Sequence, residues 1–247
     1  MFDAVKVKND CVQWLKDWEH ENAQGCNFVV GISGGKDSSV VAALLVQAFG
    51  KDRVIGVSMP NGEQKDIADV HAIVAHLGIK LLNINIGTSV SDIIARLHYS
   101  EIDISEQTIT NLPPRIRMAT LYAISQSVNG RVACTDNASE AYIGYSTRWG
   151  DNVGDFSPLV NLTSDEVIAI GDALGLPYEL THKTPSDGLC GKTDEDNFGF
   201  TYEVLNKYIL TGECEDEEIK AKIDNLHNKN LFKLQPIPSF VPMGGRD

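Results

Sequence analysis

The residues best suited to chemistry follow a short apolar run close to the N-terminus. Two serines, a lysine and an aspartate stand there among three glycines, in the order Gly31-Ile32-Ser33-Gly34-Gly35-Lys36-Asp37-Ser38. Glycines let backbone N–H groups approach an anion closely, and a helix that starts directly afterwards adds positive potential at its N-terminus. The loop therefore predicts a phosphate site.

The spacing within this loop excludes two common phosphate loops. A Walker A loop has four residues between its glycines and Ser or Thr after its lysine, whereas Gly31 and Gly35 enclose three residues and Asp37 follows the lysine. A G-x-G-x-x-G dinucleotide fingerprint starts at neither Gly31 nor Gly34. Asp37 would repel a phosphate unless Mg²⁺ lay between them, and Mg²⁺ typically binds one or two carboxylates together with phosphate oxygens. The alternative is a plain helix N-cap, in which Ser or Asp binds free N–H groups after a tight turn.

Short apolar runs alternate with helical patterns along the first half of the chain. We predict strands at 27–32, 53–58, 80–86 and 131–135, and helices at 38–49, 63–77, 88–98 and 103–127. Such alternation implies right-handed βαβ units and a parallel sheet. An amphipathic helix at 4–21 is expected to dock on this sheet or on a second subunit. The pair Pro113-Pro114 should interrupt or start the helix at 103–127.

The second half of the chain is richer in loops. Residues 144–158 contain many Gly, Asp, Asn and Ser residues, which is typical of an ordered functional loop or a flap. Thr163 and Glu166 form a capping box that should open a helix ending near residue 175. Residues 201–230 have a helical pattern with a break at Thr211-Gly212.

Length and composition limit the class of protein. A chain of 247 residues with 43% hydrophobic content can form one domain over residues 1–247. The balance of 21 basic against 34 acidic residues argues against a nucleic-acid partner. No apolar run is long enough for a membrane span and no signal peptide is evident, so we expect a cytoplasmic protein. Five cysteines without paired spacing predict neither a disulfide framework nor a zinc site.

The loop Ser-Gly-Gly-x-Asp-Ser after the first strand resembles the pyrophosphate loop of the N-type ATP pyrophosphatases. Three later segments are similar to those of one branch, the NAD synthetases. They begin at Asn111 (Asn-Leu-Pro-Pro-Arg-Ile-Arg-Met), at Thr135 (Thr-Asp-Asn-Ala-Ser-Glu) and at Gly144 (Gly-Tyr-Ser-Thr-Arg-Trp-Gly-Asp). The resemblance extends from about residue 10 to residue 235. It implies a Rossmann-like open parallel five-stranded sheet with helices on both faces, as in the adenine nucleotide alpha hydrolases.

The resemblance also implies roles for individual residues. The ATP-binding residues would be Gly31, Ile32, Ser33, Gly34, Gly35, Lys36, Asp37, Ser38, Thr135, Ser164 and Ser186. The catalytic Mg²⁺ ligands would be Asp37 and Glu140, and deamido-NAD would contact Arg115, Arg148, Asp155 and Lys233. Three of these positions depart from the family pattern, which has lysine in place of Arg148 and Ser164 and threonine in place of Ser186. Lys183 or Lys192 could supply the cation missing at Ser164.

The activity that the resemblance implies is the amidation of deamido-NAD. The nicotinate carboxylate would attack the α-phosphorus of ATP, pyrophosphate would leave, and ammonia would displace AMP. Because the recognised segments fill almost the whole chain, we expect free ammonia rather than an internal glutaminase domain to be the nitrogen source, unless a separate subunit delivers the ammonia. Compact NAD synthetases are homodimers, so a homodimer is expected as well. Two alternatives stay open, namely another adenylating member of the family and a non-catalytic nucleotide-binding module of the same fold.

Overall fold

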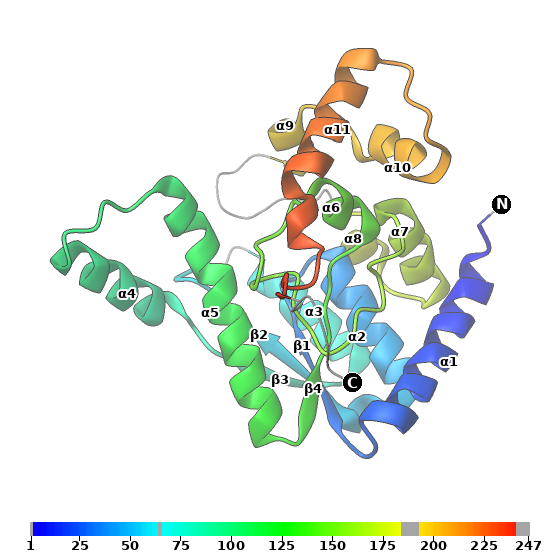
Figure 1. The fold of residues 1–247 in the computed structure, drawn as a ribbon. Coiled ribbons are helices and arrows are strands. Elements are labelled where there is room, and N and C mark those ends of the chain that lie inside the picture. Colours follow the sequence, from blue (N-terminus) through cyan, green and yellow to red (C-terminus); the bar gives the residue numbers. More distant parts are fainter. Residues whose placement is uncertain (1, 64–65, 184–192, 241–247) are drawn as a thin grey trace, which may run out of the picture.

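The computed structural model describes residues 2–63, 66–183 and 193–240. Its centre is a parallel sheet of β1 (Asn27–Gly31), β2 (Val54–Ser58), β3 (Lys80–Asn83) and β4 (Gly130–Val132), in the order β3-β2-β1-β4 (Figure 1). Phe28 is in register with Val54 on one side and with Arg131 on the other. The central strand β1 is thus buried between two neighbours, as its apolar composition predicts. The predicted parallel α/β class is confirmed.

The prediction of five strands is wrong for the part of the chain that the structure describes, where the sheet has four strands. The outer side of β4 carries only an isolated parallel bridge between Ala133 and Phe156, with a hydrogen bond from Cys134 N to Phe156 O of 2.9 Å. In the same segment Asp155 N donates to Val132 O at 2.7 Å. This pairing is too short to count as a fifth strand.

One face of the sheet is covered by helices from both ends of the chain. They are α1 (Ala4–Asn22), α2 (Lys36–Phe49), α3 (Ile67–Leu77), α7 (Ser164–Ala173) and the short α8 (Tyr178–Thr181), with the 3₁₀ turn η1 (Lys51–Arg53) between α2 and β2. Leu15 of α1 is fully buried in this layer with Phe28 and Leu44, and the ring of Trp18 lies 4.6 Å from that of Phe156. The first helix therefore packs on its own chain, which is one of the two predicted docking places.

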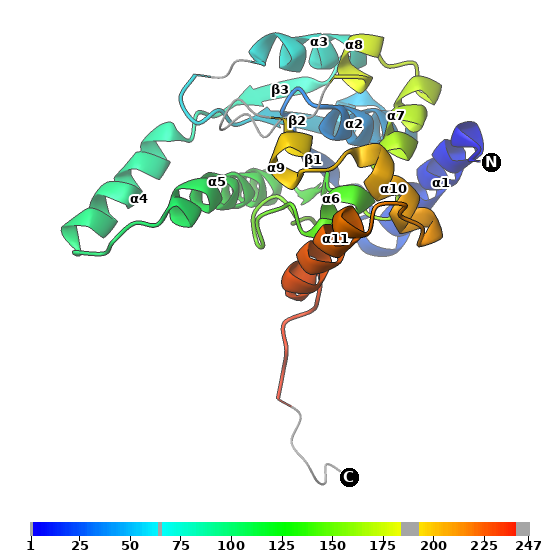
Figure 2. The ribbon, with the colours of Figure 1, turned by 90° about the horizontal axis from the view of Figure 1, so that it is seen from above.

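The opposite face is covered by α5 (Glu106–Ser127), which is preceded by α4 (Gly87–Tyr99). Figure 2 shows α4 and α5 on one side of the sheet and α2 and α3 on the other. Contrary to the prediction, Pro113 and Pro114 neither start nor interrupt α5, because both lie inside it. Because proline has no N–H group, the backbone carbonyls of Ile109 and Thr110 lose their helical hydrogen-bond donors. Both residues are exposed, so water can bind these carbonyls instead.

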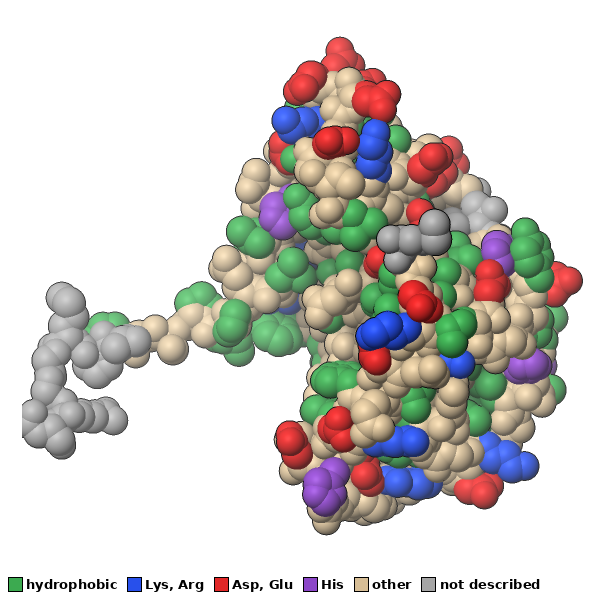
Figure 3. All heavy atoms as spheres, turned by 90° about the vertical axis from the view of Figure 1, so that its right-hand side faces the viewer, with side chains coloured by type: hydrophobic (Ala, Val, Ile, Leu, Met, Phe, Trp, Pro, Cys, Tyr) green, Lys and Arg blue, Asp and Glu red, His purple; other side chains and the backbone are tan. Residues whose placement is uncertain are grey.

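A third cluster of helices follows the carboxyl edge of the sheet. It consists of α6 (Ala138–Ile143), α9 (Asp194–Phe198), α10 (Tyr202–Thr211), α11 (Glu217–Asn230) and the turn η2 (Leu231–Lys233), packed around Ile143, Leu205 and Ile223. Exposed acidic side chains gather where α10 meets α11, at the top of Figure 3. Among the described residues, no helix has the length and apolar character that a membrane crossing requires.

Candidate active site

The predicted phosphate loop joins β1 to α2 at the carboxyl edge of the sheet. Ile32 still donates to Val57 O at 2.8 Å, and the chain then turns at Gly34, whose φ is +88°. A Cβ atom at Gly34 would lie 3.1 Å from both the backbone oxygen of Asp66 and the Cβ of Asp69. Glycine is therefore needed at this position for its backbone angle and for its size.

The serines of the loop hold its own backbone. Gly35 N donates to Ser33 Oγ at 3.2 Å, while Ser38 Oγ donates to Gly35 O at 3.1 Å and lies 3.2 Å from Ser33 Oγ. Helix α2 starts at Lys36 with Gly35 as its N-cap, and no side chain caps this end. The plain N-cap alternative is thus wrong, and the first turn of α2 keeps N–H groups available for an anion.

Asp37 and Glu140, the two predicted metal ligands, come together from α2 and α6. Asn137 connects them, because its Nδ2 donates to Asp37 Oδ1 at 3.0 Å while its Oδ1 accepts from Glu140 N at 3.0 Å. Burial, and after it the nearby carboxylate of Asp37, raises the pKa of Glu140 well above its usual value. A carboxylate pair in this condition is stabilised by a cation.

Lys36 provides a positive charge beside Asp37 and Glu140. Its side chain is 4% exposed, and its ammonium donates to Asp37 Oδ2 at 2.9 Å and lies 5.7 Å from the centre of the Tyr202 ring. Burial alone would lower the pKa of Lys36, but the charges of Asp37 and Glu140 raise it. Lys36 therefore stays charged and neutralises part of the acidic group.

Two further carboxylates close to this pair were missed by the sequence analysis. Asp136 is buried in the loop between β4 and α6, and burial, followed by the charges of Asp151 and Asp37, raises its pKa to about 7. Asp194 is buried at the start of α9 and accepts from Tyr202 OH at 3.2 Å. Asp136 could have been found as the residue after Thr135, and Asp194 as the first residue of a segment, Asp-Glu-x-x-x-Gly-x-x-Tyr, that resembles the family pattern.

The donor set fits Mg²⁺ better than a metal that needs a complete protein cage. Within the described ranges, no three His, Cys, Asp or Glu side chains are arranged to hold a metal ion. Mg²⁺ is commonly bound by one or two carboxylates, with phosphate oxygens and water completing six positions. Asp37 and Glu140 beside an anion-binding helix end provide such a set.

The predicted substrate residues Arg115, Arg148 and Lys233 meet at the flap, residues 144–158. Lys233 Nζ donates to Gly144 O at 2.7 Å and to Ser146 O at 2.9 Å. Arg115 Nε donates to Arg148 O at 3.3 Å, and the Arg148 guanidinium lies between the rings of Trp149 and Phe232, 4.9 and 5.2 Å from their centres. The three cations thus come from α5, the flap and the C-terminal turn to one region.

The other described site residues lie beside β4, after its end, and at the start of α7. Asp155 faces β4, where its Oδ2 accepts from Val132 N at 2.7 Å, and Thr135 follows β4 at the carboxyl edge. Ser164 is buried at the start of α7 and its Oγ accepts from Asn206 Nδ2 at 3.2 Å. Ser186 lies outside the described residues, as does Lys192.

Lys183 lies beside the phosphate loop, although it was only an alternative in the sequence analysis. Its ammonium donates to Asp66 at 2.7 Å and to Asp69 at 2.6 Å, the same two residues that border Gly34. Lys183 is therefore a candidate replacement for the cation missing at Ser164, because it bonds two aspartates that contact the loop.

Arg117 is a partly buried cation that the sequence analysis quoted in a motif but did not assign. Its Nε donates to Met59 O at 3.1 Å, directly after β2, and burial lowers its pKa while Asp151 opposes that shift. No described carboxylate forms a salt bridge with it. A guanidinium in this position is available to an anion at the carboxyl edge.

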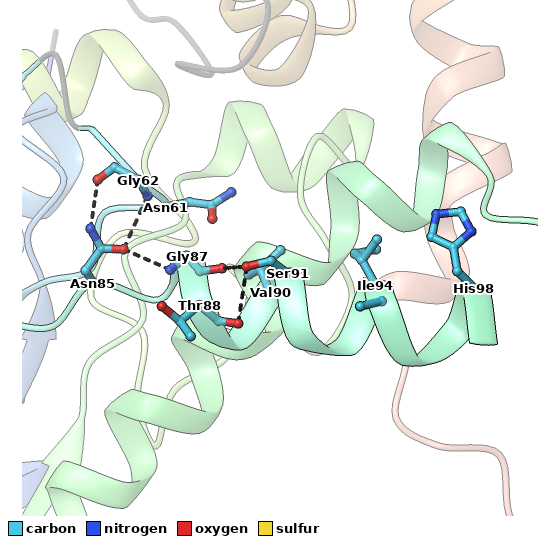
Figure 4. Close-up of a pocket in the computed structure, with 10 residues that line it drawn as sticks. Asn61, Gly62, Asn85, Gly87, Thr88, Val90, Ser91, Ile94 and His98 are labelled. Atoms are coloured by element: carbon cyan, nitrogen blue, oxygen red, sulfur yellow. Dashed lines mark hydrogen bonds between the residues drawn. The ribbon is translucent and has the colours of Figure 1, made fainter. Parts of the chain in front are cut away.

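A separate hollow runs along α4 and contains none of the predicted site residues. It measures about 750 Å³, and Figure 4 shows Val90, Ile94 and His98 along one of its sides. Asn85 closes its end by donating to Gly62 O at 2.9 Å and accepting from Gly87 N at 2.9 Å. The chemistry predicted for this chain therefore belongs to the phosphate loop and not to this hollow.

Fold and site together define a nucleotide-binding α/β protein with an anion loop and a carboxylate pair at the switch point of an open parallel sheet. The chain belongs to the NAD synthase family, whose model matches residues 7–237. It is 40% identical to the NH(3)-dependent NAD(+) synthetase of Carboxydothermus hydrogenoformans over 94% of this chain and 95% of that protein. It is 38% identical to the enzyme of the same name from Pyrococcus furiosus over 83% of this chain and 77% of that protein.

Solved structures agree with this assignment. The NMN synthetase of Francisella tularensis superposes with a TM-score of 0.88 and 32% identity, covering 99% of this chain and all of that one. The NH3-dependent NAD synthetase of Campylobacter jejuni superposes with a TM-score of 0.78 and 27% identity, covering 98% of this chain and all of that one.

Proposed function

We propose that the protein is an ammonia-dependent NAD synthetase, which uses ATP to convert the nicotinate carboxylate of deamido-NAD into an amide. The observation that carries this proposal is the pair Asp37 and Glu140 beside the open first turn of α2, in a chain of the NAD synthase family. That arrangement suits the departure of pyrophosphate, which concentrates negative charge where the loop can neutralise it.

The reaction consists of two displacements. A carboxylate oxygen of the substrate attacks the α-phosphorus, forming an oxygen–phosphorus bond as the bond to the β-phosphate bridging oxygen breaks. Ammonia then attacks the carbonyl carbon of the adenylate, a carbon–nitrogen bond forms, AMP leaves, and a proton is released. Most of the rate enhancement in such phosphoryl transfer comes from positioning and charge neutralisation.

The residues of the chain divide this work. The first turn of α2 holds the leaving pyrophosphate. The hydrogen bond between the Ser33 and Ser38 hydroxyls and the bond from Ser38 Oγ to Gly35 O maintain the conformation of the loop. Lys36 adds a buried positive charge. Asp37 and Glu140 would hold Mg²⁺, which supplies Lewis-acid polarisation of the phosphates when bound.

The pyridine nucleotide is assigned to the flap side. Arg115, Arg148 and Lys233 converge there, and guanidinium groups bind phosphates with paired hydrogen bonds. Asp155 has a weaker case, since its carboxylate is engaged by the backbone of β4. Ser164 has a weaker case as an ATP contact, since its hydroxyl accepts a hydrogen bond from Asn206. Lys183 is the better candidate for that contact.

A single assay tests the proposal. The protein is incubated with ATP, Mg²⁺, deamido-NAD and ammonium, and NAD, AMP and pyrophosphate should appear in equal amounts. Formation of ADP, or ATP binding without turnover, would contradict it. Asp37→Asn and Glu140→Gln should abolish turnover without unfolding the protein, whereas Asp103→Asn, in an exposed loop, should leave it unchanged.

A second candidate substrate is the mononucleotide that carries the same nicotinate carboxylate. The observation that favours it is the superposition on a structure titled NMN synthetase, which is tighter than that on the Campylobacter NAD synthetase. Both substrates would undergo the same chemistry. The ratio of kcat/KM for the two carboxylates decides between them.

We further propose a homodimer formed through α4 and the N-terminal part of α5. Helix α4 has no buried residue, and Tyr99 and Ile109 of this region are 90% and 59% exposed. Figure 1 shows α4 and the N-terminal end of α5 projecting away from the sheet. An apolar surface of this kind on a second copy of the chain would cover it.

A further inference from the structure

Asn137 lies between the two carboxylates assigned to Mg²⁺ and makes a different bond with each side of its amide. It is fully buried, at the end of the loop that follows β4 and immediately before α6. Its Nδ2 donates to Asp37 Oδ1 at 3.0 Å. Its Oδ1 accepts from Ser139 N at 2.9 Å and from Glu140 N at 3.0 Å.

The bond to Asp37 fixes one carboxylate. With Asn137 on Oδ1 and the Lys36 ammonium on Oδ2, the carboxylate of Asp37 is held from both sides. Its plane and the direction of its remaining lone pairs are therefore set by two neighbours. Mg²⁺ demands near-octahedral geometry, so the orientation of a ligand carboxylate affects its affinity.

The other half of the amide fixes the second carboxylate. By capping the first turn of α6, Asn137 fixes the backbone at Glu140 and hence the direction from which that side chain leaves the helix. Serine, threonine and aspartate cap helices as well as asparagine does. Serine and threonine have one hydroxyl oxygen for both tasks, and aspartate has no donor when ionised. Asparagine accepts with its amide oxygen and donates to Asp37 with its separate NH₂ group.

We propose that Asn137 is a positioning residue that sets the relative geometry of Asp37 and Glu140 for Mg²⁺. This inference rests on the proposed function, since it takes both carboxylates as metal ligands. Loss of a group that orients a metal ligand typically lowers metal affinity by about 10- to 100-fold. Asn137 should act in that range, through the ligands and without touching ATP.

Asn137→Ser separates its two bonds. Serine keeps the cap on α6 but is too short to reach Asp37, so only the metal should be affected. We expect the Mg²⁺ concentration for half-maximal activity to rise by about 10-fold or more. Mn²⁺ binding in the presence of α,β-methylene-ATP, followed by electron paramagnetic resonance, should weaken by a similar factor without requiring turnover.

Asp216→Ala is the matched control. Asp216 caps α11 with the same pattern, since its Oδ1 accepts from Glu218 N at 2.9 Å and Ile219 N at 3.1 Å, far from the acidic pair in sequence. This variant should lower Tm but leave the Mn²⁺ affinity unchanged. Asn137→Thr, a second capping residue, repeats the test should the serine variant be unstable.

The outcomes are distinct for the two proposals. Wild-type affinity for Mn²⁺ in both Asn137→Ser and Asn137→Thr overturns the positioning role. A wild-type protein that binds Mn²⁺ with the ATP analogue but forms no NAD overturns the proposed function instead, and the effect of Asn137 on Mn²⁺ binding stays measurable.

Discussion

The ammonium of Lys36 donates to the carboxylate of Asp37 at 2.9 Å, although the two residues are consecutive at the start of α2. Adjacent residues on a helix point in different directions, so this bond requires the lysine to fold back over the helix end. Lys36 thereby enters the acidic group around Glu140 and Asp194, both of which raise its pKa.

Replacing Lys36 by Met should destabilise the protein when no metal is added. The change leaves Asp37 and the buried part of the acidic group without their cation, and breaking a buried ion pair typically costs about 3 kcal/mol or more. Added Mg²⁺ should raise Tm more in the variant than in the wild type. Thermal unfolding in EDTA and in Mg²⁺ measures both effects.

Lys207→Met provides the control for this substitution. Lys207 of α10 pairs with Glu215 at the exposed surface, where solvent screens the two charges and such a pair adds little to stability. Equal Tm values for Lys36→Met and Lys207→Met in EDTA would show that Lys36 has no special role.

Gly34→Ala should impair ATP binding. A methyl group at this position meets the Asp66 backbone oxygen and the Asp69 Cβ at 3.1 Å in a backbone conformation with φ of +88°. We expect KM for ATP to rise by about 10-fold, equivalent to about 1.4 kcal/mol of lost binding.

Gly50→Ala separates backbone strain from the steric contact. Gly50 also has a positive φ, +81°, but a Cβ atom there meets nothing within 4 Å. This variant should lose stability by about 1 kcal/mol and keep the wild-type KM for ATP. The same KM in both variants would mean that the close contact at Gly34 is unimportant.

Lys233→Met should loosen the flap. The ammonium makes two charge-assisted hydrogen bonds to the carbonyls of Gly144 and Ser146, and such bonds contribute about 1.5 to 3 kcal/mol each. Proteolysis within residues 144–158 should become faster and KM for the pyridine nucleotide should rise. Lys229→Met, on the exposed side of α11, should change neither quantity. Unchanged proteolysis in the Lys233 variant would mean that the two hydrogen bonds of Lys233 do not hold the flap.

Asp136 predicts a particular dependence of stability on pH. Its pKa of about 7 in the folded protein lies above that of an unfolded aspartate, about 3.9. Between these values the folded state binds more protons, so stability falls as pH rises through this window and then levels. Asp136→Asn cannot ionise and should flatten this part of the curve.

The measurement is thermal unfolding in EDTA between pH 5 and pH 8. Asp136→Asn should have a higher Tm than the wild type at the upper end, while a slope from Glu140 remains, since its pKa is raised too. Asp103→Asn, in an exposed loop, should follow the wild-type curve. A wild-type slope in Asp136→Asn would mean that its carboxyl group does not titrate in this range.

Charges on the surface of α4 and α5 should disrupt the proposed homodimer. Tyr99→Glu combined with Ile109→Glu places two carboxylates on the exposed apolar area, and light scattering should then report a monomer. Leu210→Glu changes a residue of α10 that is 61% exposed and should leave the dimer intact. A wild-type monomer, or dissociation by Leu210→Glu instead, contradicts the proposed surface.

Sequence by itself determined the features that depend on neighbouring residues. The strand, the glycine turn and the start of α2 are contiguous, so the anion loop and the demand of Asp37 for a cation follow from residues 27–38 alone. The parallel α/β class followed for the same reason, because hydrophobic periodicity is local. The capping box at Thr163 and Glu166 is another local feature, and it is present in the structure.

Only the tertiary structure decided which distant groups meet. Asn137 reaches Asp37 across 100 positions because β1 and β4 are adjacent and both end at the same edge of the sheet. Asp155 Oδ2 accepts from the backbone of β4 and Ser164 Oγ accepts from Asn206, and neither partner follows from the sequence around these two residues. Side-chain direction at such positions depends on strand register and on the packing of helices far apart in sequence, which local pattern does not specify.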